Sequence, residues 1–523
     1  MKFEGRFRIP APREEVFARL NDPHFFVACL EGVSDLQEID EDHYTAKLET
    51  RIAYIKFRFD VAVALLERVA PSRVVAQLEG TPLGTVGRLT SMAVANLVDA
   101  EGGRETDIVY EMEVALTGKL GSLGQPVMKS KAREMEQGFV RKASAAFIGQ
   151  TPEAMAAASV ATPPRSITPS EDRIRYGALR LWAARLARAI AARLGAEEAP
   201  GQHGAASEPV ELAEREGTAA VPVGVVHRGG AAKTSLSFDL VRPRSVAEAV
   251  QLLSGDDHSI RPFSGGTALM LMMKSGVFKP SRLVDLSALE EELGGLAPDK
   301  AGGLRIGSLA RLADLGENDD VRTIAPVITQ IMPRLSNVRV RNAARVGGAL
   351  AHGDPHMDLP PVLAALGAQV EIVGPKGSRM LRLEDLYVGY YQTQLAQGEI
   401  IVHVHVPPQA GWQSGYRKTT VRTYDDWPAL GVAVSLRLED GVVRDARIVI
   451  SAATEKVTRL FGVEGLIRGA RLTEQLCQEA GVLAAGSVDT VSDVQGSSEY
   501  KKVLVEVEMS RALQAFLQEE VIA

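Results

Sequence analysis

Two glycine-rich turns in the second half of the chain have the residue types best suited to holding a phosphate. The first reads Ser264-Gly265-Gly266-Thr267 and the second reads Val346-Gly347-Gly348-Ala349. Paired glycines carry no Cβ, so their backbone N–H groups can converge on a concave surface that suits a pyrophosphate. Because two such turns occur, they indicate one long, phosphate-bridged ligand that is held from both sides.

An acidic segment follows the second turn and reads Gly353-Asp354-Pro355-His356-Met357-Asp358. We expect the Asp358 carboxylate to accept hydrogen bonds from a ribose or another ligand hydroxyl. Neither turn is a P-loop, since no Gly-Lys-Ser/Thr follows, and the Gly-x-Gly-x-x-Gly pattern of the Rossmann fold is absent too. The remaining interpretation is a dinucleotide cofactor held by another fold.

The histidines offer weaker signals. His352 and His356 have the spacing of a metal-binding pair on a helix, but the glycine and the proline between them break such a helix. His403 and His405 project to one face of an expected strand, and we expect them to face the surface or a partner. No metal site and no catalytic residue is predicted.

Lys418 and Trp427 are candidates for positions beside a flavin ring. A lysine can hydrogen-bond the ring and stabilise its reduced anionic form, and an aromatic side chain can shield the ring. The alternative is an ordinary surface lysine and a core tryptophan, and the sequence leaves both interpretations open.

Size and composition set wider limits. A chain of 523 residues predicts several domains, and no apolar run approaches the ~18 residues of a membrane span. Its two cysteines, Cys29 and Cys477, cannot hold an iron–sulfur cluster or a Cys₄ zinc site. With no signal-peptide core, the expected location is the cytoplasm. A net charge of −7 argues against nucleic acid as a partner.

Residues 1–148 read as one unit. A strand at 3–9 and a helix at 14–20 precede stretches that alternate apolar and polar residues, and a helical pattern covers about 123–147. Alternation favours an antiparallel sheet with one wet face. We expect this sheet to wrap round the long C-terminal helix and to leave a cavity between them.

Residues 149–232 are rich in alanine, proline and glycine and are interpreted as a linker. Within it, Thr168-Pro169-Ser170-Glu171 is a capping box that opens a helix over 169–194. One face of this helix is apolar and includes Trp182, while arginines occupy the other sides. Such a cationic amphipathic helix suits an anionic membrane surface. The alternative is a helix packed on this protein or on a partner.

Two further units follow, at 233–408 and 409–523, and both mix strands with helices. In the first we expect helices at 246–253, 326–335 and 359–366 and strands at 282–286, 304–307, 369–373 and 400–405. In the second we expect strands near 415–420, 431–438 and 446–452 and helices at 472–485 and 501–517. This order predicts an α+β multidomain fold with helices packed on one face of the sheet.

Several motifs of the last two units match a known family. They are Arg261-Pro-Phe-Ser-Gly-Gly-Thr-Ala-Leu, Gly347-Gly348, Gly353-Asp-Pro-x-x-Asp-x-Pro, Gly398-Glu-Ile-Ile, Glu499-Tyr500-Lys501 and Arg511-Ala512. Residues 233–520 thereby resemble the flavin-binding medium subunit of the molybdenum hydroxylases, above all that of aerobic carbon monoxide dehydrogenase. The resemblance implies FAD held between two subdomains of the PCMH-type fold shared with vanillyl-alcohol oxidase, followed by a C-terminal α+β domain.

The same resemblance implies cofactor-binding roles for both turns, for one carboxylate and for two residues near the flavin ring. These residues are Ser264, Gly265, Gly266, Thr267, Ala268, Arg345, Val346, Gly347, Gly348, Ala349, Asp358, Lys418 and Trp427. The second turn departs from the family's usual Thr-Ile-Gly-Gly-Asn, because Arg345 and Ala349 replace its threonine and asparagine. Arg345 could instead pair with phosphate.

The first unit carries a second resemblance. Its motifs Ile9-Pro-Ala-Pro, Leu20-Asn-Asp-Pro, Ala28-Cys-Leu-x-Gly and Gly118-Lys-Leu-x-x-Leu-Gly are similar to those of the G subunit of carbon monoxide dehydrogenase, a helix-grip (START-like) domain. That family is associated with membrane attachment and with a quinone-type lipid. The chain thus resembles a fusion of the G subunit with a medium subunit.

Together the resemblances imply an FAD-carrying electron-transfer subunit of a molybdenum hydroxylase. Its partners would be a molybdopterin large subunit and a small subunit with [2Fe–2S] clusters, in a dimer of heterotrimers. The expected acceptor is a membrane quinone reached through the first domain, which would place the complex on the inner face of the cytoplasmic membrane. One alternative is a soluble acceptor, oxygen or NAD, with the first domain only docking. The other is a non-catalytic lipid-binding assembly protein. The oxidised substrate is not identified.

Overall fold

The computed structural model describes residues 2–52, 55–83, 87–118, 125–147, 238–275 and 278–517. The expected linker at 149–232 and its helix at 169–194 lie outside the described residues. Within the described ranges, no helix combines the length and the apolar character that crossing a membrane requires.

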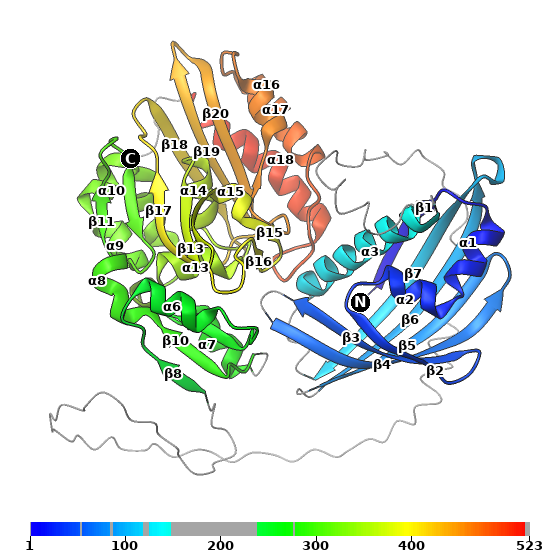
Figure 1. Ribbon diagram of the computed structural model, residues 1–523. Helices are drawn as coiled ribbons and strands as arrows, with labels where there is room; N and C mark the ends of the chain where they lie inside the picture. The colour runs from blue at the N-terminus through cyan, green and yellow to red at the C-terminus, as the bar shows by residue number, and fades with distance from the viewer. Residues whose placement is uncertain are drawn as a thin grey trace, which may run out of the picture. The chain divides into compact units, whose positions relative to one another are not determined.

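The first region is built on a seven-stranded antiparallel sheet in the order β1-β7-β6-β5-β4-β3-β2. Its strands are β1 (Lys2–Ile9), β2 (Val33–Glu38), β3 (His43–Ile52), β4 (Ile55–Val69), β5 (Arg73–Pro82), β6 (Gly87–Ala100) and β7 (Glu105–Gly118). Neighbouring strands pair over most of their length, as alternating sequences favour. The expected antiparallel sheet is therefore present (Figure 1).

Three helices, α1 (Arg13–Leu20), α2 (Pro23–Cys29) and α3 (Gln125–Phe147), accompany this sheet. Asp22 accepts a hydrogen bond from the His24 N–H and caps α2, whose first residue is a proline. Helix α3 contacts β1, β3 and α2, and its Phe139 and Ala143 pack in one cluster with Ile9 of β1. A cavity of about 190 Å³ between α3 and the β2–β3 edge has a largely polar lining: Glu31, Gly32, Glu49, Thr50, Lys131, Glu134, Met135 and Gly138.

The second region opens with a parallel three-stranded sheet, β8 (Asp239–Val241), β10 (Arg282–Asp285) and β9 (Ile260–Phe263). Helices α6 (Val246–Leu253) and α7 (Thr267–Lys274) belong to it, together with a short helical segment at 286–293. Ser245 caps α6 by accepting from the Glu248 N–H, which agrees with the helix expected at 246–253.

A five-stranded sheet follows, in the order β11-β12-β17-β13-β14. Its strands are β11 (Leu296–Pro298), β12 (Leu304–Gly307), β17 (Ile400–Val406), β13 (Gln369–Gly374) and β14 (Gly377–Arg382). The helices of this region are α9 (Leu312–Glu317), α10 (Asp319–Ile324), α11 (Pro326–Ile331), α12 (Val338–Ala343), α13 (Val346–His352), α14 (Leu359–Ala365) and α15 (Leu383–Leu386), and β15 (Tyr387–Gly389) pairs with β16 (Gln392–Thr393). The single helix expected at 326–335 is wrong, because α11 gives way to a 3₁₀ turn at Met332–Arg334, where Pro333 has no N–H to continue an α-helix.

The third region contains the sheet β18-β19-β20-β21 (Trp412–Thr419, Leu430–Glu439, Val442–Ser451, Thr458–Arg459) and helices α16 (Phe461–Ile467), α17 (Glu474–Gly486) and α18 (Ser498–Gln514). Figure 1 shows these helices together on one side of the sheet, where they share a core with β19 and β20. Helix α14, whose seven residues are all buried, contacts β19 and β20 as well. The expected one-faced packing is thus incomplete, since a helix of the preceding region also packs on this sheet.

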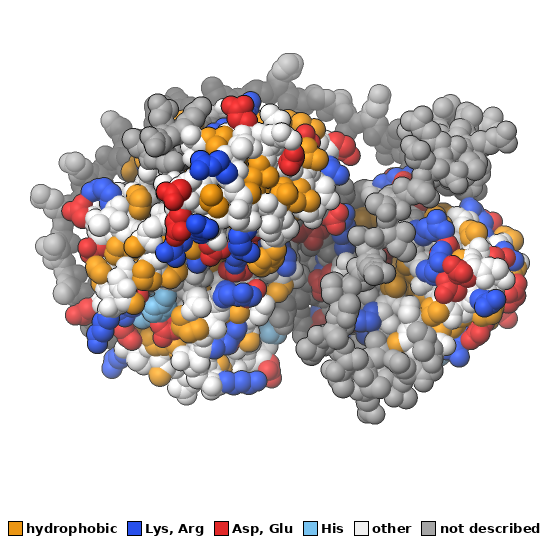
Figure 2. Space-filling model, turned by 90° about the horizontal axis from the view of Figure 1, so that it is seen from above, with side chains coloured by type: hydrophobic (Ala, Val, Ile, Leu, Met, Phe, Trp, Pro, Cys, Tyr) orange, Lys and Arg blue, Asp and Glu red, His pale blue; other side chains and the backbone are white. Residues whose placement is uncertain are grey.

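Charged side chains of both signs are interspersed over the face of the molecule drawn in Figure 2. Mixed signs limit the long-range field that such a face can exert on a charged ligand.

Candidate functional site

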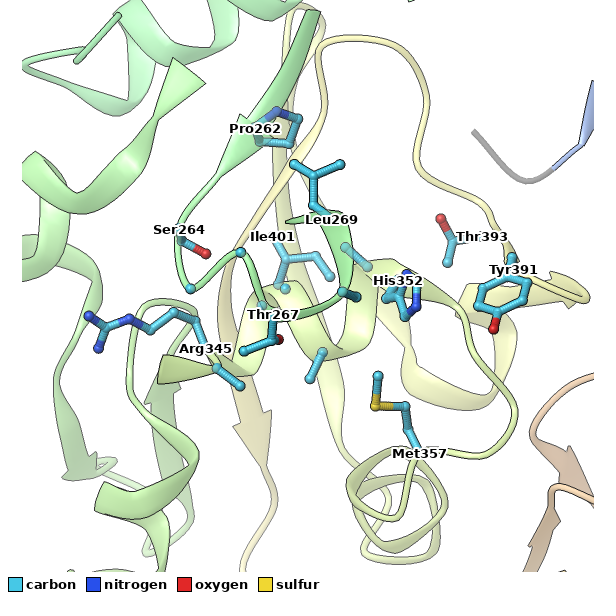
Figure 3. A pocket seen from close by; sticks show the side chains of 18 of the residues that line it. Pro262, Ser264, Thr267, Leu269, Arg345, His352, Met357, Tyr391, Thr393 and Ile401 are labelled. Carbon is cyan, nitrogen blue, oxygen red and sulfur yellow. The ribbon is translucent and has the colours of Figure 1, made fainter. Parts of the chain in front are cut away.

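A pocket of about 960 Å³ in the second region is lined by both glycine turns. Ser264 directly follows strand β9 and lies in the pocket wall. Helix α7 begins at Thr267, the last residue of the first turn. Helix α13 starts within the second turn. Figure 3 shows Ser264, Thr267 and Arg345 on one side of this pocket and His352, Tyr391 and Met357 on the other.

The two turns lie against each other, and the structural constraint that requires glycine differs from one position to the next. A Cβ on Gly265 would collide with the backbone of Ala343, and one on Gly347 would lie 2.7 Å from the Ser308 Cβ. Gly266 has a φ of 65°, which favours glycine. A Cβ on Gly348, in contrast, would meet only the Ser264 Oγ, at 3.7 Å. Close packing at Gly265 and Gly347 and the backbone conformation at Gly266 thus require glycine. At Gly348 the missing Cβ leaves space free on the pocket wall.

Both turns also end in helix starts that no side chain caps. Gly266, before α7, has no side chain to cap the helix, and the side chain of Arg345, before α13, makes no capping hydrogen bond. The first N–H groups of a helix have no partner within that helix. In the second turn, however, the Val346 and Gly347 N–H groups donate to the Ala310 and Ser308 carbonyls, at 3.0 and 2.7 Å. The N–H groups at the start of α7 and that of Gly348 are therefore the backbone donors of this wall that suit an anionic group.

Arg345 lines the same wall with a side chain that is 15% exposed. Its Nη1 lies 3.1 Å from Glu290 Oε1, yet this nitrogen has no hydrogen-bond partner of suitable geometry. Its Nη2 donates to Glu290 Oε2 at 3.4 Å, so Glu290 holds the guanidinium through one nitrogen. Nη1 is left as a donor without a partner of suitable geometry.

Asp358 lines the pocket and is paired within the protein. Its Oδ2 accepts a 2.8 Å bond from Lys418 Nζ and its Oδ1 a 2.7 Å bond from the Tyr416 hydroxyl, so both oxygens already have protein partners. Burial raises the pKa of this carboxyl, and the neighbouring Lys418 opposes that rise. Lys418 also donates to the Arg334 carbonyl. Asp358 borders the pocket, whereas Lys418 lies behind it, 3% exposed.

Trp427 borders the pocket and is half exposed. Its ring is stacked on His356, with ring centroids 6.1 Å apart and 22° between the planes. The alternative of an ordinary core tryptophan is therefore wrong, because half of the side chain is accessible.

His356 is the centre of a buried network that the sequence did not predict. Its Nδ1 lies 2.9 Å from Asp354 Oδ1, its Nε2 lies 2.8 Å from Asp493 Oδ2, and Asp493 also pairs with Lys501. Burial lowers the pKa of His356, but the two carboxylates outweigh burial and raise it overall. The pKa values of Asp354 and Asp493 are lowered despite burial, chiefly because His356 bonds to both.

Tyr391 is a second pocket residue that sequence reasoning missed. Its φ of 56° is rare for a residue with a side chain. Its ring lies 4.9 Å from that of His352, and its hydroxyl donates to Asp354. No motif signals such a residue, because its importance follows from a backbone conformation and from contacts with distant residues.

Most of the predicted site residues come together around the pocket. The residues that line it are Ser264, Gly265, Gly266, Thr267, Ala268, Arg345, Gly347, Gly348, Ala349, Asp358 and Trp427. Val346 is fully buried in the hydrophobic core below the second turn, and Lys418 lies behind Asp358.

Comparisons with known proteins connect this pocket to a class of cofactor. Residues 236–409 match the family described as the FAD binding domain in molybdopterin dehydrogenase, and residues 415–516 match the CO dehydrogenase flavoprotein C-terminal domain. Residues 5–147 match the family of the carbon monoxide dehydrogenase G subunit, CoxG. The fold and the pocket are thus those of a flavoprotein subunit, preceded by a domain of a second family.

Individual relatives show which kind of flavoprotein subunit this chain resembles. The glyceraldehyde dehydrogenase medium chain of Sulfolobus acidocaldarius is 30% identical over 270 residues, 52% of this chain and 95% of that protein. The carbon monoxide dehydrogenase medium chain of Afipia carboxidovorans is 30% identical over 281 residues, 53% and 96% of the two chains. This chain belongs to the family of FAD-binding medium chains of molybdopterin dehydrogenases, which are oxidoreductase subunits.

Solved structures support the same fold. Carbon monoxide dehydrogenase from Oligotropha carboxidovorans aligns with a TM-score of 0.51 at 29% identity, over 53% of this chain and 96% of the matched chain. Quinoline 2-oxidoreductase from Pseudomonas putida 86 aligns with a TM-score of 0.51 at 26% identity, over 55% and 99%. The resemblances inferred from the motifs are confirmed for the CoxG and medium-chain parts.

FAD is the cofactor of this family, and two observations show that the pocket wall fits it. Gly348 leaves room where a Cβ would otherwise stand, and Arg345 Nη1 is a buried donor without a suitable partner. The volume of about 960 Å³ also lies within the range of cofactor sites.

Proposed function

We propose that residues 233–408 and 409–523 form the PCMH-type FAD-binding domain and the C-terminal domain of a medium subunit. In this proposal the chain passes electrons from [2Fe–2S] clusters of a small partner subunit, by way of FAD, to an acceptor. Substrate is oxidised at a molybdopterin centre in a large partner subunit. The observation that carries the proposal is the single pocket wall formed by two glycine turns that are far apart in the sequence.

The proposed roles of the site residues follow from their placement. Residues 264–268 and 345–349 bind the pyrophosphate through the backbone N–H groups of the first turn and of Gly348, with Arg345 as a charged donor, because the Val346 and Gly347 N–H groups already donate to carbonyls of the protein. Trp427 shields one side of the ring system from water. Asp358 and Lys418 act as a buried pair that holds Tyr416 and fixes the wall beneath the ligand. FAD, when bound, supplies the capacity to accept and release electrons singly or in pairs.

The first domain supports a proposal about the acceptor. Residues 5–147 match the CoxG family, and an antiparallel sheet accompanied by the long helix α3 is consistent with a helix-grip domain. We propose that residues 1–148, with the linker at 149–232, bring the complex to a membrane quinone. The described cavity of about 190 Å³ in this domain is below the ~300–1,000 Å³ of most small-molecule sites.

The cofactor part of the proposal is tested by purifying the full chain, recording its absorbance spectrum and identifying the released cofactor by chromatography. Bound FAD at one equivalent per chain supports it. A chain that remains colourless after FAD is added, alone and in complex with its partners, contradicts it.

The acceptor part is tested on the assembled complex by deleting residues 1–195. Loss of quinone reduction and of membrane association, with electron transfer to an artificial dye unchanged, supports the proposed role. Unchanged quinone reduction and membrane association would contradict it and favour oxygen or NAD as the acceptor. The dimer of heterotrimers is tested by the mass of the same complex.

A further inference from the structure

The outer face of the five-stranded sheet carries a group of metal-ligating side chains away from the pocket. His403 and His405 alternate on β17 and therefore project to the same face. Glu371 on β13 is the direct cross-strand partner of His403, and His405 lies two residues further along β17, opposite Gln369. The sheet register thus places two imidazoles and one carboxylate together.

The three side chains converge on one point. Glu371 Oε2 lies 3.1 Å from His403 Nδ1 and 3.0 Å from His405 Nε2. One ligand atom from each of the three residues lies within 4.8 Å of the other two. The side chains are 14%, 31% and 31% exposed for His403, His405 and Glu371. They are partly withdrawn from water yet open on one side.

We propose that Glu371, His403 and His405 form a binding site for a divalent transition-metal ion such as Zn²⁺. The ligand atoms are Glu371 Oε2, His403 Nδ1 and His405 Nε2. Two imidazoles and one carboxylate with an open fourth position are a known zinc donor set. Imidazole ligands favour Zn²⁺, Cu²⁺ and Ni²⁺ over Mg²⁺ and Ca²⁺, which prefer oxygen. The site is separate from the FAD pocket, since none of its three residues lines that pocket.

The protons can be accounted for without a change in the charge of either ring. In the metal-free state His403 Nδ1–H and His405 Nε2–H each donate to Glu371, so both rings can be neutral. Binding requires each proton to move to the ring's other nitrogen, which frees the ligating nitrogen.

Arg305 on β12 is the group that opposes the metal. Its Nη1 lies 3.4 Å from His403 Nε2. When His403 Nδ1 binds the metal, Nε2 carries the ring proton, so two N–H donors, Arg305 Nη1 and His403 Nε2, would face each other. The positive charge of the guanidinium also repels the metal cation. Arg305 must swing away for the metal to bind. Removing its charge is therefore expected to strengthen binding, whereas removing a ligand weakens it.

The test is calorimetric titration of Zn²⁺ into the full chain, free of any affinity tag and treated with a chelator, with folding checked by circular dichroism. We expect saturable binding at one ion per chain. H403A, H405A and E371Q should each weaken binding by about 100-fold or more, because each removes a ligand. R305Q should strengthen it by roughly tenfold. As a second readout, Co²⁺ absorbance should show a low-coordinate site that the H403A/H405A double variant lacks.

His43 provides the matched control. It is a strand histidine that pairs with one carboxylate, Asp40, in the first region. H43A should leave the Zn²⁺ titration unchanged. The proposal is overturned if the full chain shows no saturable binding, or if the H403A/H405A double variant binds as tightly as the unmodified chain.

Discussion

The pocket has two walls that differ in the chemical groups that form them. One wall is backbone from the two glycine turns, where a missing Cβ at Gly348 leaves free space. The other contains buried ionisable side chains, with Asp358 paired to Lys418 and His356 held between Asp354 and Asp493. Altering the first wall at Gly348 should change ligand binding with little effect on folding, whereas altering the second wall should change stability first.

The buried carboxylates near this wall differ in the direction of their pKa shifts. Asp358 pairs with Lys418, yet burial raises its pKa. The pKa of Asp493, which bonds to His356 and Lys501, is lowered despite burial, and so is that of Asp354, which pairs with His356 but not with a lysine. Interactions that favour the charged form thus outweigh burial at Asp354 and Asp493 but not at Asp358.

The largest expected effect is that of K418M. It leaves Asp358 without a cation in a buried setting, which costs about 3–5 kcal/mol of unfolding free energy. Urea denaturation measures this loss. The double variant K418M/D358N should recover much of it, because no unpaired charge remains. If K418M alone is as stable as the unmodified chain, the wall does not depend on this pair.

H356Q is expected to cost about 1.5–3 kcal/mol near neutral pH, because glutamine replaces two charge-assisted hydrogen bonds with weaker ones. His356 has a folded pKa above its unfolded value of 6.5, so its contribution is complete below that value and is lost as the pH rises through the folded pKa. Urea titrations at a series of pH values should therefore show the gap between H356Q and the unmodified chain narrowing as the pH rises. A gap that widens instead would mean that His356 is neutral in the folded state.

G347A and G348A form a matched pair on the glycine wall. G347A should cost about 1–3 kcal/mol, because its Cβ would lie 2.7 Å from the Ser308 Cβ. G348A should leave the stability of the FAD-free chain unchanged or raise it by up to about 1 kcal/mol, since alanine favours the helix. G348A should nevertheless weaken FAD binding, measured by flavin fluorescence. Equal FAD affinity in G348A and the unmodified chain would mean that the ligand does not approach this position.

W427A should have the smallest effect on stability, within about 0.5 kcal/mol, because half of its side chain is exposed. Its effect should appear in the accessibility of the bound flavin, measured by iodide quenching of flavin fluorescence. W412A is a control, since Trp412 stacks on Arg447 instead. The same quenching in W427A and W412A would argue against the shielding role.

Local patterns predicted much of this molecule, and long-range contacts account for what they missed. The glycine turns and most strands and helices followed from residue type and period. The orientation of Lys418 behind Asp358 depends on the pairing of β18 with β19, which a strand pattern does not fix. The His356 network includes Asp493, which is distant from His356 in the sequence. The residues next to Asp493 form no motif that would predict this contact. His403 and His405 were expected to face the surface or a partner, but their common contact with Glu371 depends on sheet register.

Helix α14 has a consequence for how the chain can be divided. All seven of its residues are buried, and it packs in one core with residues of the five-stranded sheet and of β19 and β20. The two segments that match separate flavoprotein families therefore share an interior. A fragment that stops between them would expose the apolar surface of α14 to water and to other copies of itself. Synthesis of this part of the chain must reach the last sheet before α14 is fully covered, so newly made chains pass through an aggregation-prone stage.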